Sequence, residues 1–284
     1  RKKYVAFGGA RGGGKSWAVR CKAKLLALRY PGIRLLLVRR SLPELEANHL
    51  TFLRQELAEV AEYRAGDKRF VFGNGSILQF GYCGSDRDLD RYQGAEYDVI
   101  FLDEATQLKE LWMRQIAACL RGVNDFPKRI YYTCNPGGPG HGYIKRLFID
   151  RRYEPGEDPE DYAFIPARVT DNTALLARQP DYLKTLEALP PKLRRAWLEG
   201  RWDIMEGQVF QEFTDDPAHY EDRQWTHVIR PFDVPREWSV YRSYDFGYAK
   251  PFSCGWWAVD HDGCVYRIAE LYGCTATPNE GVLW

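Results

Sequence analysis

The sequence has little that would suit a membrane protein, a disulfide-rich scaffold or a zinc protein. Its apolar runs are much shorter than the roughly 20 residues that cross a bilayer, and no signal segment opens the chain. The seven cysteines include no C-x-x-C pair, and the five histidines form no cluster with metal-ligand spacing. We therefore expect an intracellular protein without membrane contact, whose cysteines are reduced structural thiols.

An excess of charge of either sign is also lacking, because 40 Lys and Arg residues oppose 39 Asp and Glu residues, for a net charge of +1. This balance gives no overall field that would attract nucleic acid, so DNA binding would have to depend on local patches. A length of 284 residues allows about two domains. The first predicted strand begins almost at residue 1 and no closing element ends the chain, so we expect a fragment of a longer protein.

What the sequence does contain is a glycine-rich loop that fits the phosphate-binding pattern G-x-x-x-x-G-K-[ST]. It follows a short strand-like stretch, residues 4–7, and precedes apolar residues at helical spacing. Glycines let the backbone N–H groups of such a loop point at phosphate oxygens, and the helix start adds its positive end. We predict a nucleotide site in which Lys15 contacts the β- and γ-phosphates and Ser16 ligates Mg²⁺. The loop consists of Gly9, Ala10, Arg11, Gly12, Gly13, Gly14, Lys15 and Ser16.

A second motif has the Walker B form, in which a buried strand delivers carboxylates to the nucleotide. The apolar residues 99–102 are followed directly by Asp103 and Glu104. We expect Asp103 to hold Mg²⁺ through its water shell, and Glu104 to polarise the water that attacks the γ-phosphate. The alternative is a pair of solvated acids at the start of the next helix, where acidic residues are favoured.

A third strand-like stretch, residues 129–134, ends in polar residues and a Pro-Gly-Gly turn. In a parallel sheet its tip faces the same crevice as the two motifs above. Thr133 and Asn135 are therefore candidates for sensing the γ-phosphate and passing its loss to the rest of the molecule. Without the earlier motifs, a plain Asn-Pro-Gly turn explains the same residues.

The remaining pattern favours an α/β fold with a mostly parallel sheet. Residues 33–38 form a nearly continuous apolar run, as in a parallel strand buried on both faces. The other predicted elements are a helix over 43–63, a hairpin over 69–80, a helix over 107–121, a strand over 162–168 and one or two helices over 182–199, broken by Pro190-Pro191.

The pattern changes toward the end of the chain. Residues 214–237 are polar and rich in Asp, Pro and His, which is typical of a linker. They precede an alternating strand over 239–248, which carries Asp245, and then a hairpin over 254–268 with a turn at Asp260–Gly263.

These stretches together resemble the large terminase subunit of tailed double-stranded-DNA bacteriophages and prophages. The resemblance is carried by the loop Gly9–Ser16 with an arginine inside it, by Tyr92-Gln93-Gly94-Ala95-Glu96 before Val99–Thr106, and by Thr133–Gly138. It implies a P-loop ATPase of the RecA-like (ASCE) kind, followed by the start of a ribonuclease H-like nuclease domain. The implied division is an ATPase core over 1–150, its lid over 151–213, a linker over 214–237 and the first part of the nuclease over 238–284.

The function that the resemblance implies is a motor that uses ATP and Mg²⁺ to drive viral double-stranded DNA into a procapsid. Glu104 is then the catalytic base, Thr133 to Asn135 the coupling motif, and Arg11 the arginine near the γ-phosphate. The motor is expected to act as a homo-oligomeric ring on a portal, with a small terminase subunit, in the cytoplasm of the bacterial host cell.

Other residues receive roles from the same resemblance. Asp245 matches the first carboxylate of a two-metal nuclease site that uses Mg²⁺ or Mn²⁺. Its partner carboxylates are expected beyond Trp284, so this chain should not cut DNA, and Glu270 is expected to be structural. A neighbouring subunit could supply an arginine finger, for which Arg91 and Arg87 are candidates and Arg121 an outsider. The basic cluster Lys192, Arg194 and Arg195 is either a DNA contact or a solvated helix face.

Three other functions share the same motifs. A nucleic-acid helicase or remodelling ATPase uses the same Walker pair, but no second helicase core follows the predicted linker. A P-loop kinase acting on a small molecule is disfavoured by Glu104 directly after Asp103, which favours water as the acceptor. A nucleotide-binding switch without enzymatic activity differs in that it would not turn ATP over.

Overall fold

The computed structural model describes residues 2–203, 215–222, 224, 226–246 and 252–273. By its internal contacts the chain divides into two compact units, Arg1–Gly207 and Gln208–Trp284. Among the described residues, no helix combines the length and the apolar composition that crossing a membrane requires.

The first unit is built on an eight-stranded sheet with the strand order β3-β4-β5-β2-β6-β7-β1-β8. In this order, the neighbouring strands β5-β2-β6-β7-β1-β8 all pair in parallel. The pairs β3-β4 and β4-β5 are antiparallel. The predicted α/β class with a mostly parallel sheet is therefore confirmed, and the predicted hairpin joins the sheet beside β2. The strands are β1 (Tyr4–Gly9), β2 (Arg34–Arg39), β3 (Ala61–Arg64), β4 (Arg69–Phe72), β5 (Ile77–Tyr82), β6 (Val99–Leu102), β7 (Arg129–Cys134) and β8 (Tyr162–Ala167).

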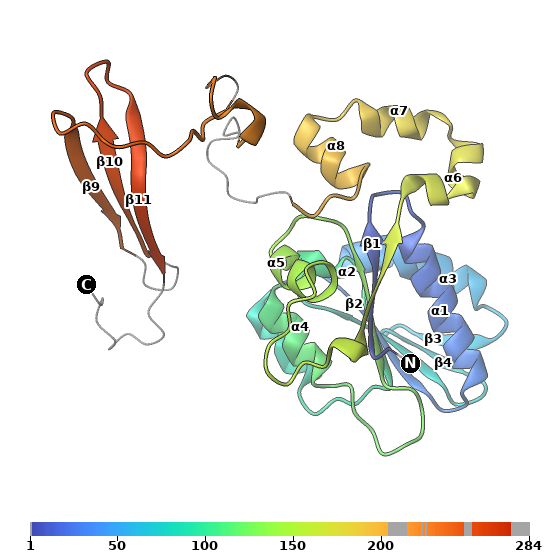
Figure 1. Cartoon of the computed structure of the whole chain (residues 1–284). Helices are drawn as coiled ribbons and strands as arrows, with labels where there is room; N and C mark the ends of the chain where they lie inside the picture. Colours follow the sequence, from blue (N-terminus) through green and yellow to red (C-terminus); the bar gives the residue numbers. More distant parts are fainter. Residues whose placement is uncertain (1, 204–214, 223, 225, 247–251, 274–284) are drawn as a thin grey trace. The chain divides into compact units, whose positions relative to one another are not determined.

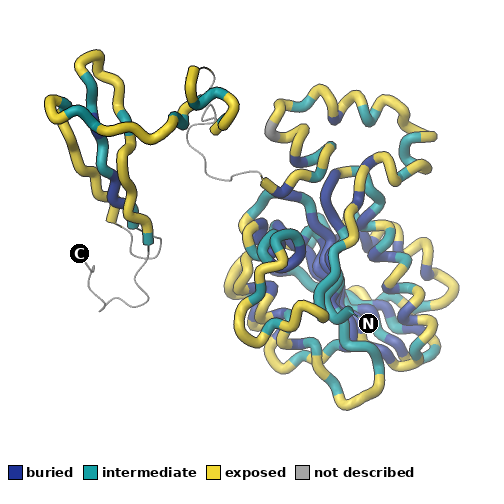
Figure 2. The backbone as a smooth tube through the Cα atoms, in the orientation of Figure 1, coloured by how far each residue is buried: buried dark blue, intermediate teal, exposed yellow. Residues whose placement is uncertain are grey.

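Helices cover both faces of this sheet (Figure 1). Leu35 and Leu37 of β2 belong to the core cluster on the α1 side, and Leu36 and Val38 to the cluster on the α4 side. Alternate residues of a strand face opposite ways, and all four side chains are fully buried, as Figure 2 shows for the centre of the unit. The covering segments are α1 (Lys15–Arg29), α2 (Leu42–Leu45), η1 (Glu46–Leu50), α3 (Thr51–Glu56), η2 (Asp86–Tyr92), η3 (Ala105–Gln107), α4 (Glu110–Ala117), α5 (His141–Ile144), η4 (Lys145–Ile149) and η5 (Pro159–Asp161).

The segment after β8 leaves the sheet and forms three short helices beyond the ends of β1 and β8 (Figure 1). A 3-10 turn, η6 (Val169–Asp171), leads into α6 (Thr173–Arg178), α7 (Asp181–Glu187) and α8 (Pro191–Trp197), which we call the lid helices. The predicted break at Pro190-Pro191 separates α7 from α8. Strand β8, which falls within the range 151–213 predicted as the lid, pairs with β1 at the edge of the central sheet, and the lid helices follow it. The division into core and lid stays a prediction.

Two predicted helices are shorter than expected. The helix predicted over 43–63 ends at Glu56, and residues Ala61–Arg64 form strand β3 instead. Pairing with β4 satisfies that backbone, and the ring of Tyr63 packs on Phe70 at 4.9 Å between centroids. The helix predicted over 107–121 is confined to α4, because the residues before it form the turn η3.

The second unit contains one three-stranded antiparallel sheet in the order β11-β10-β9. Its elements are η7 (Pro217–His219), β9 (Ser239–Asp245), β10 (Phe252–Val259) and β11 (Val265–Gly273). The predicted hairpin between β10 and β11 is confirmed. Its turn is held by Asp260, whose Oδ1 accepts the N–H groups of Asp262 and Cys264. The ribonuclease H-like character of this unit stays a prediction.

Candidate functional site

The phosphate loop lies between β1 and α1, with Lys15 at the first position of the helix. Gly12 and Gly14 have φ angles of 77° and 74°, in the left-handed region that glycine adopts without strain. The Lys15 side chain is only 8% exposed, and its Nζ donates to the carbonyl oxygen of Ala10 at 2.5 Å. Burial lowers the pKa of Lys15, although the nearby Asp103 opposes this shift. The loop therefore presents a buried ammonium group beside a helix start.

Asp103 follows β6 and is the most enclosed carboxylate of the site, with no exposed side-chain surface. Its Oδ1 accepts the hydroxyl proton of Thr133 at 2.5 Å, and Ser16 Oγ lies 3.4 Å from its Oδ2. Burial alone would raise the pKa of Asp103, but His49, Arg39 and Thr133 lower it to about 2. The carboxylate is therefore ionised at neutral pH and can only accept hydrogen bonds.

Arg39, the last residue of β2, joins both Walker B acids. Its Nε lies 3.1 Å from Asp103 Oδ2, and its Nη2 lies 2.8 Å from Glu104 Oε1. A third contact runs from Nη1 to the carbonyl oxygen of Glu44 at 3.1 Å. The guanidinium is almost completely buried, whereas the Glu104 side chain is 42% exposed. Glu104 is thus reachable from solvent but held by a buried cation.

Glu104 has a φ angle of 52°, which is strained for a residue other than glycine. Its N–H donates to Thr133 Oγ1 at 2.9 Å, while the hydroxyl of Thr133 donates to Asp103. Thr133 therefore connects the backbone of one Walker B acid to the carboxylate of the other. The structure brings this predicted coupling residue into direct contact with the predicted catalytic acids.

Asn135 lies beside a cavity of about 300 Å³ that also borders Glu104 and Arg11. Its carbonyl oxygen accepts the hydroxyl of Thr106 at 2.9 Å, while its buried side-chain Oδ1 has no hydrogen-bond partner among the described residues. Helix α8 lines the same cavity through Leu193, Ala196 and Trp197. The predicted coupling loop, base and loop arginine therefore share one cavity.

The lid helices contact the phosphate loop directly. Arg11 lies over the ring of Trp197, with Cζ 3.3 Å from the ring centroid, and its N–H donates to the carbonyl oxygen of Trp197 at 2.7 Å. Asn172 Nδ2 donates to the carbonyl oxygen of Gly12 at 2.7 Å. A loop arginine that was predicted near the γ-phosphate is thus stacked on the lid in this structure.

The residues gathered at the site include two that sequence reasoning missed, Arg39 and His49. Arg39 had a usable signal, because it follows a predicted buried strand and so lies at the same sheet edge as Asp103. His49 had none, since the apolar spacing around it indicated only an amphipathic helix. Its Nε2 lies 2.8 Å from Asp103 Oδ2, and the side chain is fully buried.

The arginine-finger candidates are not part of this cluster. Arg91 lies over the ring of Tyr82, with Cζ 4.0 Å from the centroid, and pairs with Asp88 at 3.3 Å. Arg121 pairs with Glu96 at 3.5 Å, and Arg87 is exposed. All three lie outside the cavity beside Glu104, so a role in a neighbouring subunit's site stays a prediction.

The other predicted residues lie on α8 and in the second unit. Asp245 is exposed at the end of β9 in the second unit. Glu270 pairs with Arg267 at 3.0 Å and accepts a hydrogen bond from Ser253. Arg194 and Arg195 are exposed on α8, while the side chain of Lys192 lies outside the described residues.

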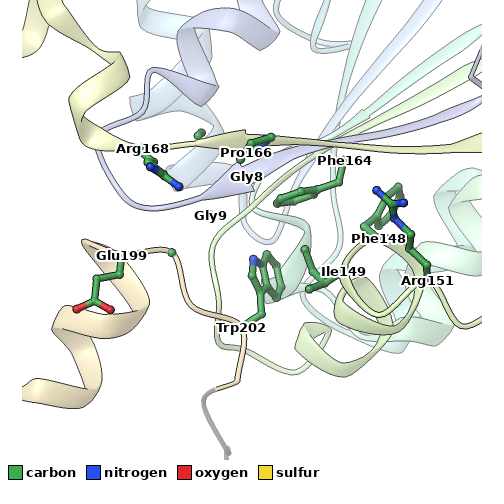
Figure 3. A pocket seen from close by; sticks show the side chains of 12 residues that line it. Gly8, Gly9, Phe148, Ile149, Arg151, Phe164, Pro166, Arg168, Glu199 and Trp202 are labelled. Atoms are coloured by element: carbon green, nitrogen blue, oxygen red, sulfur yellow. The ribbon is translucent and has the colours of Figure 1, made fainter.

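A larger cavity, of about 480 Å³, lies at the sheet edge and is lined by Gly8 and Gly9 of β1 (Figure 3). Phe164 and Trp202 face it in Figure 3, and their rings are in edge contact, with centroids 6.2 Å apart. It shares no lining residue with the cavity beside Glu104. Its aromatic lining belongs to or packs against the core cluster on the α4 side, so it extends that core rather than the acidic site.

The oxygen atoms at the site suit a magnesium ion that arrives with a nucleotide. Among the described residues, no three His, Cys, Asp or Glu side chains converge as a metal site. The Ser16 hydroxyl and the Asp103 carboxylate are instead adjacent, and Mg²⁺ favours one or two such oxygen ligands together with phosphate oxygens and water. The residues present therefore fit the predicted ion.

The parallel sheet, the phosphate loop and the acid pair at the neighbouring strand end together define a P-loop ATPase fold. The family model described as "Terminase large subunit, T4likevirus-type, N-terminal" matches residues 6–214. The chain therefore belongs to this family of phage large terminase subunits, which confirms the resemblance seen in the sequence.

Solved structures show the same fold. The large terminase from a thermophilic bacteriophage is 19% identical and superposes with a TM-score of 0.58, over 96% of this chain and 63% of that one. The same phage protein in complex with ATP-gamma-S is 20% identical, with a TM-score of 0.57 over 95% of this chain and 62% of that one. The present chain thus spans less than two thirds of these relatives. No curated protein matches the sequence.

Proposed function

We propose that this chain is the ATP-hydrolysing part of a motor that translocates viral double-stranded DNA into a procapsid. The observation that carries the proposal is the contact network of Ser16, Asp103 and Thr133, which joins the phosphate loop, the Walker B acids and the coupling strand. The membership of the family of large terminase subunits supports the choice of DNA as the cargo.

In this proposal the phosphate loop binds ATP. Lys15, already turned toward the loop by its bond to Ala10, neutralises charge on the β- and γ-phosphates. Ser16 and Asp103 hold Mg²⁺, which when bound supplies further positive charge to the phosphate oxygens. The backbone N–H groups from Gly12 onward orient the phosphates at the start of α1. Ser16 is only partly buried, so a bound magnesium nucleotide can reach it.

Glu104 is the proposed catalytic base. It lines the cavity that Arg11 of the phosphate loop also borders, and a partly exposed carboxylate there can accept a proton from an attacking water. Its Oε1 is engaged by the guanidinium of Arg39, so we expect Oε2 to accept the proton. Arg11 has to leave Trp197 before it can reach the γ-phosphate.

Thr133 and Asn135 are the proposed coupling residues. Thr133 contacts both acids, so a change of charge at the γ-phosphate alters its two hydrogen bonds. The same strand continues into the loop that faces α8 across the cavity. A displacement of that loop would therefore change its contacts with the lid helices.

The other predicted properties belong to the whole protein. We expect a homo-oligomeric ring on a portal, a small terminase subunit and action in the host cytoplasm, with a trans-acting arginine such as Arg91. The second unit would begin a ribonuclease H-like endonuclease, with Asp245 as its first ligand for Mg²⁺ or Mn²⁺.

The test is ATP binding by two lysine variants. Lys15→Ala is expected to abolish ATP binding, whereas Lys22→Ala, which changes an exposed lysine on the same helix, is expected to leave it unaltered. Unaltered ATP affinity of the Lys15 variant would overturn the phosphate-loop assignment.

A further inference from the structure

His49 is a fully buried titratable side chain at the site to which the proposed mechanism gives no role. It has no exposed surface, and its Nε2 lies 2.8 Å from Oδ2 of Asp103. Its other ring nitrogen, Nδ1, is buried and has no hydrogen-bond partner within the described part of the chain. The polar contact that the imidazole does make there is with the carboxylate proposed to hold Mg²⁺.

A local irregularity of the helix places His49 there. Residues Glu46–Leu50 form a wider, π-helical turn, in which the N–H of Thr51 bonds to the carbonyl oxygen of Glu46. The extra residue in this turn lets both His49 and Leu50 face the core, and both are buried. Such turns recur at functional sites because they redirect one side chain without ending the helix.

The direction of the hydrogen bond follows from the other groups around Asp103. The Thr133 hydroxyl takes the N–H of Glu104 on its oxygen and donates to Oδ1, and Arg39, which can only donate, lies beside Oδ2. The carboxylate is therefore the acceptor, and Nε2 of His49 carries the proton. The same oxygen, Oδ2, also lies 3.1 Å from Nε of Arg39, and Oδ1 accepts from Thr133. The carboxylate is thus held from two strands and one helix, and Ser16 lies on its remaining side.

We propose that His49 is a positioning residue that fixes the rotation of the Asp103 carboxylate, so that one oxygen edge stays turned toward Ser16 and the cation of a bound magnesium nucleotide. This inference rests on the proposed function, since it concerns the same cation. Partners that orient the groups around a bound metal ion act through metal affinity, and their loss commonly costs about 10- to 100-fold in that affinity.

Three substitutions separate this role from simple packing. Gln carries its amide N–H about as far from the backbone as Nε2 of histidine, Asn carries it only as far as Nδ1, and Leu fills the space without a donor. We expect His49→Gln to behave like the unaltered chain. We expect His49→Asn and His49→Leu to need about 10- to 100-fold more Mg²⁺ for half-maximal tightening of ADP binding.

The measurement is calorimetric titration of the whole chain with ADP, across a series of Mg²⁺ concentrations and with EDTA, which involves no turnover. ADP affinity in EDTA should be the same for all four proteins, because His49 does not touch the phosphate loop. Equal Mg²⁺ dependence in the Leu variant and the unaltered chain would overturn the proposal. So would a loss of ADP affinity that is equal with Mg²⁺ and with EDTA. If the unaltered chain binds no ADP, the proposed function fails instead.

A second measurement does not depend on nucleotide or on the stability of the Leu variant. Long-range ¹H–¹⁵N spectra identify which ring nitrogen carries a proton, and His49→Gln assigns the signal by its disappearance. A proton on Nε2 is expected. A proton on Nδ1 alone would overturn the proposal, because Nε2 could then not donate to Asp103.

Discussion

The guanidinium of Arg39 lies 2.8 Å from Oε1 of Glu104, so one oxygen of the proposed base is paired with a buried cation. The same side chain lies 3.1 Å from Asp103. One arginine therefore contacts both acids, which are adjacent in the sequence but differ in their surroundings. Asp103 is buried among several hydrogen-bonding and charged partners, while the Glu104 side chain is 42% exposed. That asymmetry suits a fixed carboxylate at the metal beside a base that water can reach.

Replacement of Arg39 tests this arrangement through stability. Arg39→Ala removes a buried cation and leaves Asp103 with fewer partners, so we expect a loss of about 3 kcal/mol in the free energy of unfolding. The neighbouring Arg40 pairs with Glu44 at the surface, and Arg40→Ala should cost less than about 1 kcal/mol. Urea denaturation of both variants measures the difference. Equal losses would contradict the account of Arg39 as the buried partner of both acids.

Asp103 should make stability depend on pH in the acid range. Its pKa is about 2 in the folded chain, against an ordinary value of 3.8. The folded state thus binds this proton more weakly than the unfolded state, and the stabilisation is complete above 3.8 and lost as the pH falls toward 2. Urea denaturation at several pH values should show a shallower acid slope for Asp103→Asn. The exposed Asp125→Asn serves as control, and an unchanged slope in the Asp103 variant would refute the assignment.

The stacking of Arg11 on Trp197 predicts an optical signal. If ATP draws Arg11 toward the γ-phosphate, the environment of the Trp197 ring changes, and its fluorescence should respond more to ATPγS than to ADP. Trp197→Phe should abolish this difference, whereas Trp238→Phe, in the second unit, should retain it. A full nucleotide response in the Trp197 variant would show that the signal arises at another tryptophan and would contradict this prediction.

The sequence was most informative where backbone geometry requires particular residues. Glycines mark the phosphate loop, and the rule that parallel strands end at one edge was enough to group Ser16, Asp103 and Thr133, which the structure brings into contact. The long apolar run of β2 likewise indicated a strand covered on both faces. These features depend on local chemistry that is visible in a single sequence.

What escaped prediction depends on contacts between distant segments. The helical spacing of the apolar residues before Ala61 led the predicted helix on to residue 63, but Ala61–Arg64 pair with β4 as a strand. His49 contacts Asp103 from a π-helical turn over Glu46–Leu50, which apolar spacing cannot reveal. Trp197 meets Arg11 because the lid helices fold back over a loop that is far away in the sequence.

The central claim is that Glu104 drives ATP hydrolysis in a motor that acts on duplex DNA. It is tested most directly by steady-state phosphate release from ATP, with and without linear double-stranded DNA, for the unaltered chain, for Glu104→Ala and for Glu110→Ala as a control at an exposed acid on α4. We predict turnover that rises with DNA and falls by about 100-fold or more in the Glu104 variant, with ATP binding retained. Turnover that survives Glu104→Ala unchanged would contradict the account, and turnover indifferent to DNA would contradict the choice of cargo.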